Sequence, residues 1–418
     1  GGMRAVMRGW VAVMSGLWAM RFLTRAVGTD LEGESVESFE LRFRPFGRET
    51  STPSQFPNVW FYVLAGHRRL RTVLRAHPEI RLVLPQDGIF TAAFAGVAAR
   101  AAGVRVVSMD HGNVKDIYDP LWYRDETTLL RRFGPRKRAL AAVRLRFYWP
   151  SLRLLLRVAV RHTDAFLVAS DQIADLYQQR LGVPAYKISR IPWVVDTQRF
   201  APRLGDERAA LRERFGVEAD AILISMANRL HPSKGLHVAI PALARMYEAL
   251  PEDMRARVRV VILGDGPMRP RIEGQIERRK LGEVVTLWGV ASPDDVAALL
   301  SVSDVFFYSG VRDTNPVAVV EAMAAGCASV GTTSSRHITL NYAEGRGIAV
   351  PVGDEEAIAA GLVSLVRGDA ARADMGARAR LYVLTHHTAE VARRALLRVS
   401  IYQPAVVVGV PLAAPRIN

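Results

Sequence analysis

The chain has 418 residues, 50% of them hydrophobic and 23% charged, which is the composition of a folded protein with more than one domain. Its formal net charge of +15 favours anionic partners: phosphorylated substrates, phospholipid headgroups or nucleic acid. Its single cysteine, Cys327, excludes a disulfide framework and a cysteine-based metal site. We expect Cys327 to be a small buried residue in a cytoplasmic protein.

The N-terminal region contains the apolar stretch GWVAVMSGLWAM (9–20), which is too short to span a bilayer. No small-x-small cleavage site follows it, so a signal peptide is not expected. No other run of the sequence approaches the ~18 apolar residues that cross a membrane. Any membrane association is therefore expected to be peripheral.

Strands and helices alternate through the first half of the chain. Strands are predicted over residues 81–85, 104–110 and 164–170, and helices over residues 91–103 and 171–182. Between them, residues 131–161 hold ten Arg or Lys and no acid, interleaved with leucines, valines and aromatic residues. This composition predicts a surface helix that lies on anionic lipid, or else one that faces solvent or phosphate.

The second half repeats the alternation. Strands are predicted over residues 221–227, 257–264, 284–289 and 304–309, and a helix over 292–303, with Ser292 as its N-cap and Pro293 as its first residue. The alternation weakens over 191–216. We therefore predict two α/β domains, residues 1–196 and 197–418, each with a parallel sheet, facing each other across a cleft.

Ligands of parallel sheets bind beyond the carboxyl ends of the strands, so the loops there are the expected place for binding and catalytic residues. The loop NRLHPSKG (228–235) places Arg229 and Lys234 between a strand and a helix start, which suits a diphosphate, although both could be solvated cations. Gly264, in the segment VVILGDGPMRPRIE (260–273), permits a tight turn after the next strand and could be no more than that.

Two acids follow the strand of 304–309. Asp313 lies in the loop after that strand, and Glu321 lies on the helix whose start Pro316 marks. The pair could accept hydrogen bonds from a polyhydroxylated ligand, or Asp313 could only be stabilising a helix N-terminus. His111 ends a strand of the first domain, where either a structural role or a position in the cleft is possible. The sequence has no Asp-x-Asp motif and no other metal signature, so no metal is expected.

The segments NRLHPSKGL, GDGPMRPRIE, WGVASPDDVAALLSVSDVFFYS and DTNPVAVVEAMAAG, in this order and spacing, resemble the donor domain of the retaining GT-B glycosyltransferases of family 4. The segment IPWVVDTQRFAP resembles the place where these enzymes cross between domains. The resemblance covers roughly residues 164–400 well and the first domain loosely. It implies two Rossmann-like domains, with the last helix crossing back to the first.

The resemblance also implies roles for the residues singled out. Arg229 and Lys234 would hold the diphosphate of a UDP- or GDP-sugar, Glu321 the ribose, and Asp313 and His111 would approach the sugar without a metal or another cofactor. The remaining donor contacts that it implies come from Gly2, Gly264, Asn315, Pro316 and Val317.

The sequence departs from the family pattern near Asp313 and at its start. The first acid of the E-x7-E pair is Asp313, and Asn315-Pro316 replaces a Phe-Gly pair, which removes one backbone N–H. GGMRAVMRGWVAVM (1–14) resembles a glycine loop and helix that normally follow a first strand, so we expect this strand to be missing before Gly1.

The sequence thus predicts a glycosyltransferase of the hexosyltransferase type, acting in glycan biosynthesis on a glycan, a lipid-linked acceptor or a small molecule. The alternative is a nucleotide-sugar-binding subunit with weak catalysis. Nucleic-acid binding would rest on the net charge alone and is not expected.

Overall fold

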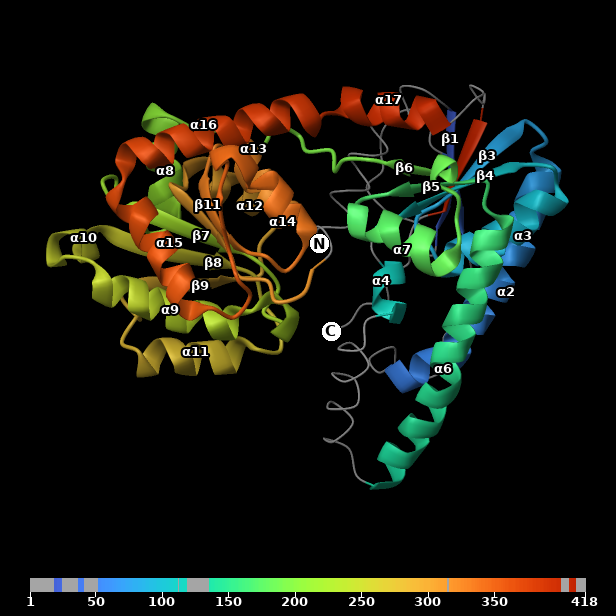
Figure 1. Ribbon diagram of the computed structural model, residues 1–418, viewed down its shortest axis with the longest axis horizontal. Coiled ribbons are helices and arrows are strands. Elements are labelled where there is room, and N and C mark those ends of the chain that lie inside the picture. The colour runs from blue at the N-terminus through green and yellow to red at the C-terminus, as the bar shows by residue number, and fades with distance from the viewer. Residues whose placement is uncertain are drawn as a thin grey trace. The chain divides into compact units, whose positions relative to one another are not determined.

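The computed structural model describes residues 19–24, 37–40, 52–111, 113–118, 135–313, 316–399 and 406–410. These residues form two compact units (Figure 1): residues 192–392 make the C-terminal unit, and those before 192 and after 392 make the N-terminal unit. The first change of unit falls after Ile191, and the second falls inside helix α17 (Ala389–Val399). Each unit is built on its own parallel sheet, so the predicted α/β class is confirmed.

Parallel strands of the N-terminal unit form a seven-stranded sheet in the order β2-β1-β13-β3-β4-β5-β6. They are β1 (Ala19–Thr24), β2 (Glu37–Glu40), β3 (Ile80–Pro85), β4 (Arg105–Asp110), β5 (Ala165–Val168), β6 (Ile188–Arg190) and β13 (Val406–Val410). The three strands predicted for the first half of the chain are confirmed as β3, β4 and β5. Strand β13 is absent from the sequence-based expectations, although it lies in the middle of the sheet.

Two helices of the N-terminal unit pack against its alanine-rich helix α3. The described helices here are α2 (Thr52–Ala76), α3 (Phe90–Ala101), α4 (Asn113–Tyr118), α6 (Pro135–His162) and α7 (Asp171–Leu181), with the short 3-10 helix η1 (Ala185–Lys187). Helix α3 contacts β3 and β4, and it also contacts α2 and α6. A Cβ at Gly96 of α3 would lie 2.8 Å from Cβ of His162, so this close approach to α6 requires glycine.

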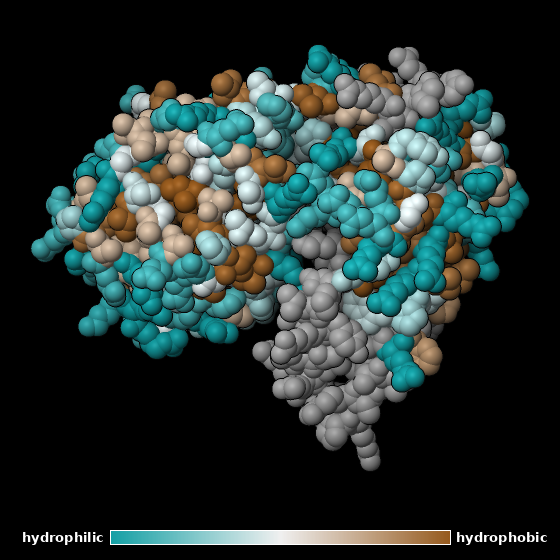
Figure 2. Space-filling view, viewed as in Figure 1, coloured by the Kyte–Doolittle hydropathy of each residue, from teal (hydrophilic) through white to brown (hydrophobic). Residues whose placement is uncertain are grey.

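Helix α6 confirms the helix predicted within residues 131–161. Its apolar face is buried in the core of the unit through Leu152, Leu155, Leu156 and Ala159. Its opposite face exposes both cations and apolar side chains: Arg146, Phe147, Arg153, Leu154, Arg157 and Arg161. Hydrophilic and hydrophobic residues accordingly lie side by side over the described part of α6 (Figure 2). Among the described residues, none of the helices combines the length and apolar character needed to cross a membrane.

The C-terminal unit has a six-stranded parallel sheet in the order β12-β11-β10-β7-β8-β9. Its strands are β7 (Ile222–Ala227), β8 (Val258–Leu263), β9 (Val285–Gly289), β10 (Val305–Tyr308), β11 (Ala328–Thr332) and β12 (Ile348–Val350). The four strands predicted for the second half are confirmed as β7 to β10. Buried side chains alternate between the two faces of β7: Ile222 and Ile224 enter one cluster and Leu223 the other. This sheet is therefore covered on both faces.

Helices of the C-terminal unit supply these two clusters. They are α8 (Gly205–Arg214), α9 (Leu236–Ala249), α10 (Glu252–Arg257), α11 (Arg269–Arg278), α12 (Pro293–Val302), α13 (Val317–Ala324), α14 (Arg336–Asn341), α15 (Glu355–Arg367) and α16 (Asp369–His386). The predicted start of α12 is confirmed, because Ser292 caps it in a capping box with Asp295 and Pro293 is its first residue. Cys327 is fully buried, as expected, and burial raises the pKa of its thiol.

Candidate active site

The carboxyl ends of β7 and β10 carry the polar residues that the sequence singled out. These strands are neighbours in the C-terminal sheet and pair through Ile224 and Val305. The chain leaves β7 into the loop 228–235 and leaves β10 into the loop that contains Asp313. Adjacent parallel strands end at the same edge of a sheet, so the two loops meet there.

The loop after β7 orients two cations differently. Arg229 is exposed, and within the described residues its guanidinium forms no hydrogen bond or ion pair. Lys234 ends the 3-10 helix η2 (Pro232–Lys234), and its side chain is largely buried. Gly235 then turns the chain into α9 with φ of +69°, where a Cβ would come within 1.9 Å of the Ser309 carbonyl oxygen. Glycine at 235 thus lets the two loops touch.

The glycine turn after β8 supports this same loop. A Cβ at Gly264 would lie 1.8 Å from the Asn228 carbonyl oxygen, and one at Gly266 would lie 2.6 Å from that of Leu230. The Leu230 amide donates to the Asp265 carbonyl at 3.0 Å, and the Met268 amide donates to the Leu230 carbonyl at 3.0 Å. Gly264 is therefore a backbone contact of the cationic loop, and its role toward a donor stays a prediction.

Asp313 lies between two donors, one from each strand end. Lys234 Nζ donates to Asp313 Oδ2 in an ion pair, and Tyr308 Oη donates to the same oxygen at 2.7 Å. The Asp313 side chain is 18% exposed and that of Lys234 22%, so this pair is only partly screened by water. Burial, and next the charge of Asp313, raise the pKa of Tyr308 well above its ordinary value. Tyr308 is therefore a protonated donor at neutral pH.

Glu321 lies on α13, the helix that follows this loop. Burial raises the pKa of Glu321 to about 7, and the positive charge of Arg199 acts in the opposite direction. Within the described part of the chain, the Glu321 carboxylate accepts no hydrogen bond. A partly buried carboxylate with unused acceptors is suited to the hydroxyl groups of a ligand.

Other predicted donor contacts are only partly described. Pro316 is the N-cap of α13 and Val317 its first residue, so the predicted start of this helix is confirmed. Asn315 and Gly2 lie outside the described residues.

His111 lies in the N-terminal unit, directly after β4. It is 9% exposed, and its Nε2 donates to Gln86 Oε1 at 3.2 Å. Burial lowers the pKa of His111 to about 4, so the imidazole is neutral at physiological pH. Gln86 follows the end of β3 directly, and the histidine is thus held by the neighbouring strand end.

Two further acids lie at the same edge of the N-terminal sheet. Asp87 accepts from the amides of Ile89 (2.8 Å) and Thr91 (3.0 Å), and burial raises the pKa of its carboxyl group. Asp110 accepts from Tyr177 Oη at 3.1 Å. Sequence reasoning missed Gln86, Asp87 and Asp110, although their position immediately after or at the end of a strand is the signal that would have found them.

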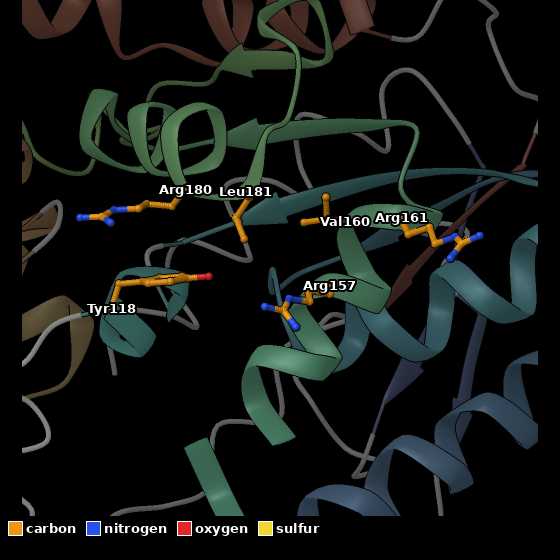
Figure 3. A pocket seen from close by; sticks show the side chains of 6 residues that line it. All are labelled: Tyr118, Arg157, Val160, Arg161, Arg180 and Leu181. Carbon is orange, nitrogen blue, oxygen red and sulfur yellow. The ribbon is translucent and has the colours of Figure 1, made fainter. Parts of the chain in front are cut away.

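A cationic pocket of about 280 Å³ lies among α4, α6 and α7 of the N-terminal unit (Figure 3). Its lining residues are Tyr118, Arg157, Val160, Arg161, Arg180 and Leu181. In Figure 3, Tyr118 extends from α4 toward Arg157 on α6, whereas Arg161 and Arg180 extend toward opposite sides. Three of the six lining residues are arginines, so the surface around this hollow carries a positive charge that favours an anionic occupant.

Both halves of the chain match known families. Residues 207–382 match the glycosyl transferases group 1, and residues 18–199 match glycosyltransferase family 4. The two matches follow each other along the chain and together include every described candidate residue discussed above.

Individual proteins are similar over part or all of the chain. WcaL of Escherichia coli K12, named as a glycosyltransferase of colanic acid biosynthesis, is 34% identical over 231 residues, which cover 54% of this chain and 52% of WcaL. D-inositol 3-phosphate glycosyltransferase of Kineococcus radiotolerans is 30% identical over 53% of this chain and 51% of its own. The chain thus spans about half the length of the curated relatives it matches.

Among solved structures, Anabaena HepE in complex with UDP-glucose superposes with a TM-score of 0.70 over 96% of each chain, at 19% identity. WaaG, a glycosyltransferase involved in lipopolysaccharide biosynthesis, superposes with a TM-score of 0.68 over 96% of each chain, at 18% identity. At such identities these likenesses establish the fold alone, with two Rossmann-like domains.

Proposed function

The chain belongs to the group 1 glycosyltransferases of family 4 with the GT-B fold, and on this basis we propose that it transfers a sugar from a nucleoside diphosphate sugar to an acceptor hydroxyl group. The observation that carries the proposal is the Lys234–Asp313–Tyr308 cluster at the carboxyl ends of β7 and β10. Binding of UDP-glucose by HepE is consistent with such a donor.

The donor diphosphate binds at the loop after β7. Arg229 is exposed and offers two parallel N–H groups to phosphate oxygens, while Lys234 supplies a positive charge from the interior of the loop. The negative charge that grows on the leaving diphosphate is stabilised by both cations. Because Asp313 already neutralises Lys234, Arg229 makes the larger contribution to holding the donor in the ground state.

Glu321 recognises the ribose of the nucleotide. Its carboxylate has unused acceptors, and two vicinal hydroxyl groups can donate to its two oxygens. The ionised form makes the stronger hydrogen bonds. With the pKa of Glu321 raised to about 7, donor binding draws the carboxylate into its ionised form.

Asp313 and His111 act on the sugar. Lys234 and Tyr308 both hold Asp313 Oδ2, so the carboxylate meets the sugar hydroxyl groups with little further loss of side-chain entropy. Neutral His111 offers a hydrogen bond without adding charge. The acceptor hydroxyl attacks the anomeric carbon on the face that the diphosphate leaves, its proton passes to the leaving phosphate, and the configuration is retained without a metal ion.

The acceptor is lipid-linked or part of a glycan, and the enzyme works at the cytoplasmic surface of the membrane. The face of α6 that exposes Phe147, Arg153, Leu154 and Arg157 combines apolar and cationic side chains, as peripheral membrane helices do. The nearby pocket of Figure 3 suits an anionic group of the acceptor or of the lipid.

A thermal-shift screen of UDP- and GDP-sugars tests the proposed donor class. A donor that binds the native protein raises its melting temperature. We expect one nucleotide-sugar to raise it for the wild type and for the control Glu277→Ala, which changes an exposed acid of α11, but not for Glu321→Ala. A screen in which no nucleotide-sugar shifts the wild type would contradict the proposal.

A further inference from the structure

Strand β13 lies inside the N-terminal sheet, although it comes from the C-terminal end of the chain. It pairs in parallel with β1 on one side, through Ala19–Val406 to Phe22–Gly409, and with β3 on the other, through Leu82–Val407 to Pro85–Val410. Four of its five residues are valine, which suits a strand covered on both faces. Residues 406–410 are thus an integral strand of this sheet.

The order of the other strands indicates which position of a doubly wound sheet β13 occupies. From β13 the chain order runs outward on both sides: β1 and β2 on one, and β3, β4, β5 and β6 on the other. In a doubly wound sheet the strand from which the order reverses is the first strand, and ligands bind beside its carboxyl end. We infer that β13 is the leading strand of the N-terminal domain, placed after the C-terminal domain in this sequence, and that its carboxyl end lies at the ligand-binding edge of the sheet.

The register places this edge next to His111. Val410 ends β13 and pairs with Pro85, which ends β3. The next residue after Pro85 is Gln86, whose side chain accepts the hydrogen bond from His111. The carboxyl end of β13 therefore lies beside the strand end that holds a proposed sugar contact. On this inference, residues 406–410 occupy the position in the sheet that a doubly wound fold gives to its first strand.

An additional strand of a C-terminal tail would be a simpler explanation, but it would pair at an edge of the sheet, with one neighbour. Strand β13 has two, so its removal would separate β1 and β2 from the rest of the sheet and leave β1 and β3 each with one unpaired edge. A central strand also exchanges its amide hydrogens only when the sheet opens, whereas a loosely attached tail exchanges freely.

Hydrogen exchange of the full chain tests the position of β13. We expect the amides of residues 406–410 to be protected at least about 100-fold over an unstructured peptide, in the same range as those of β3. Complete exchange of 406–410 at the earliest times, with β3 protected, would overturn the inference. This measurement needs no donor or acceptor, so its failure is separate from failure of the proposed function.

Moving the strand tests its identity. Deletion of residues 404–418 should abolish protection of β1 and β3 and lower the melting temperature of the N-terminal unit. A second variant carries residues 404–418 in front of Gly1 through a short Gly-Ser linker and ends at Gln403. We expect it to restore the protection of β1 and β3 to that of the full chain. The inference would be contradicted if the deletion left the amide protection of β1 and β3 unchanged. It would also be contradicted if the relocated strand failed to restore this protection.

Discussion

Lys234 and Asp313 form an ion pair that ties the loop after β7 to the loop after β10, and Tyr308 donates to the same carboxylate oxygen of Asp313. The pair couples the proposed diphosphate contact to the proposed sugar contact. Any change at Asp313 therefore alters both the orientation of the sugar and the positive charge available to the diphosphate. The first effect changes kcat, and the second changes the affinity for the donor.

Arg229→Ala should weaken donor binding by about 10-fold to 100-fold, because it removes a bidentate contact to phosphate. Titration calorimetry with the nucleoside diphosphate measures this loss. Arg279→Ala, an exposed arginine after α11, is the matched control and should bind as the wild type does. Equal affinity in the two variants would place the diphosphate elsewhere.

Glu321 should give donor binding a pH dependence centred near its pKa of about 7. The KM for the donor should fall as pH rises from 6 to 8, since the carboxylate accepts ribose hydrogen bonds best when ionised. Glu321→Gln should flatten this profile. A wild-type KM that is constant over this range would argue against the assigned role.

Glu321 also affects stability, and the sign follows from linkage. Its pKa in the folded state lies above the value of 4.5 for an exposed glutamate, so the native state binds the extra proton and stability falls as pH rises from 4.5 to 7. Glu321→Gln should therefore melt at a higher temperature than the wild type at pH 8 and show a smaller difference at pH 5. The reverse order would show that the carboxylate is not destabilised by burial.

His111→Asn should lower turnover by about 10-fold to 100-fold, because a hydrogen bond to the sugar in the transition state is lost. Since the pKa of His111 is lowered to about 4, its protonation should leave no limb in the wild-type rate profile between pH 5 and 8. The same pH–rate profile is measured for Gln86→Leu, which removes the acceptor of the His111 hydrogen bond. It shows whether that hydrogen bond affects the protonation of the imidazole. A limb near pH 6.5 that vanishes in His111→Asn would mean that the imidazole titrates normally.

Charge reversal on α6 should release the protein from anionic membranes. The double variant Arg153→Glu and Arg157→Glu should bind phosphatidylglycerol vesicles at least about 10-fold less than the wild type in a sedimentation assay, since each basic residue contributes roughly 1 kcal/mol near an anionic surface. The double variant Arg278→Glu and Arg279→Glu, with the same change of charge on α11 and its C-cap, is the control. Equal binding by both variants would exclude α6 as the membrane contact.

Local sequence patterns predicted much of this fold. Seven strands and the start of α12 at Ser292 could be predicted because the hydrophobic pattern of a strand and the capping of a helix depend on neighbouring residues. The sequence also predicted that Lys234 and Asp313 lie in loops that directly follow strands. In the structure their side chains form an ion pair.

Contacts between distant parts of the chain could not be predicted in this way. Tyr177 and Asp110 are 67 residues apart, and nothing local to either indicates their hydrogen bond. The strand β13 pairs with residues nearly four hundred positions away, and its valines alone do not say which sheet it joins. The raised pKa of Glu321 likewise depends on burial by the folded chain.

The role of Asp313 is tested most directly by measuring how fast nucleoside diphosphate is released from the donor identified by thermal shift. The assay contains a cell extract as the source of acceptor. It compares the wild type, Asp313→Asn and the control Asp206→Asn, which changes an exposed acid. We predict that Asp313→Asn lowers kcat by at least about 100-fold while it leaves donor affinity equal or higher, since Lys234 loses its counter-charge. The control should match the wild type. Wild-type kcat in Asp313→Asn would show that the carboxylate held by Lys234 and Tyr308 does not act on the sugar.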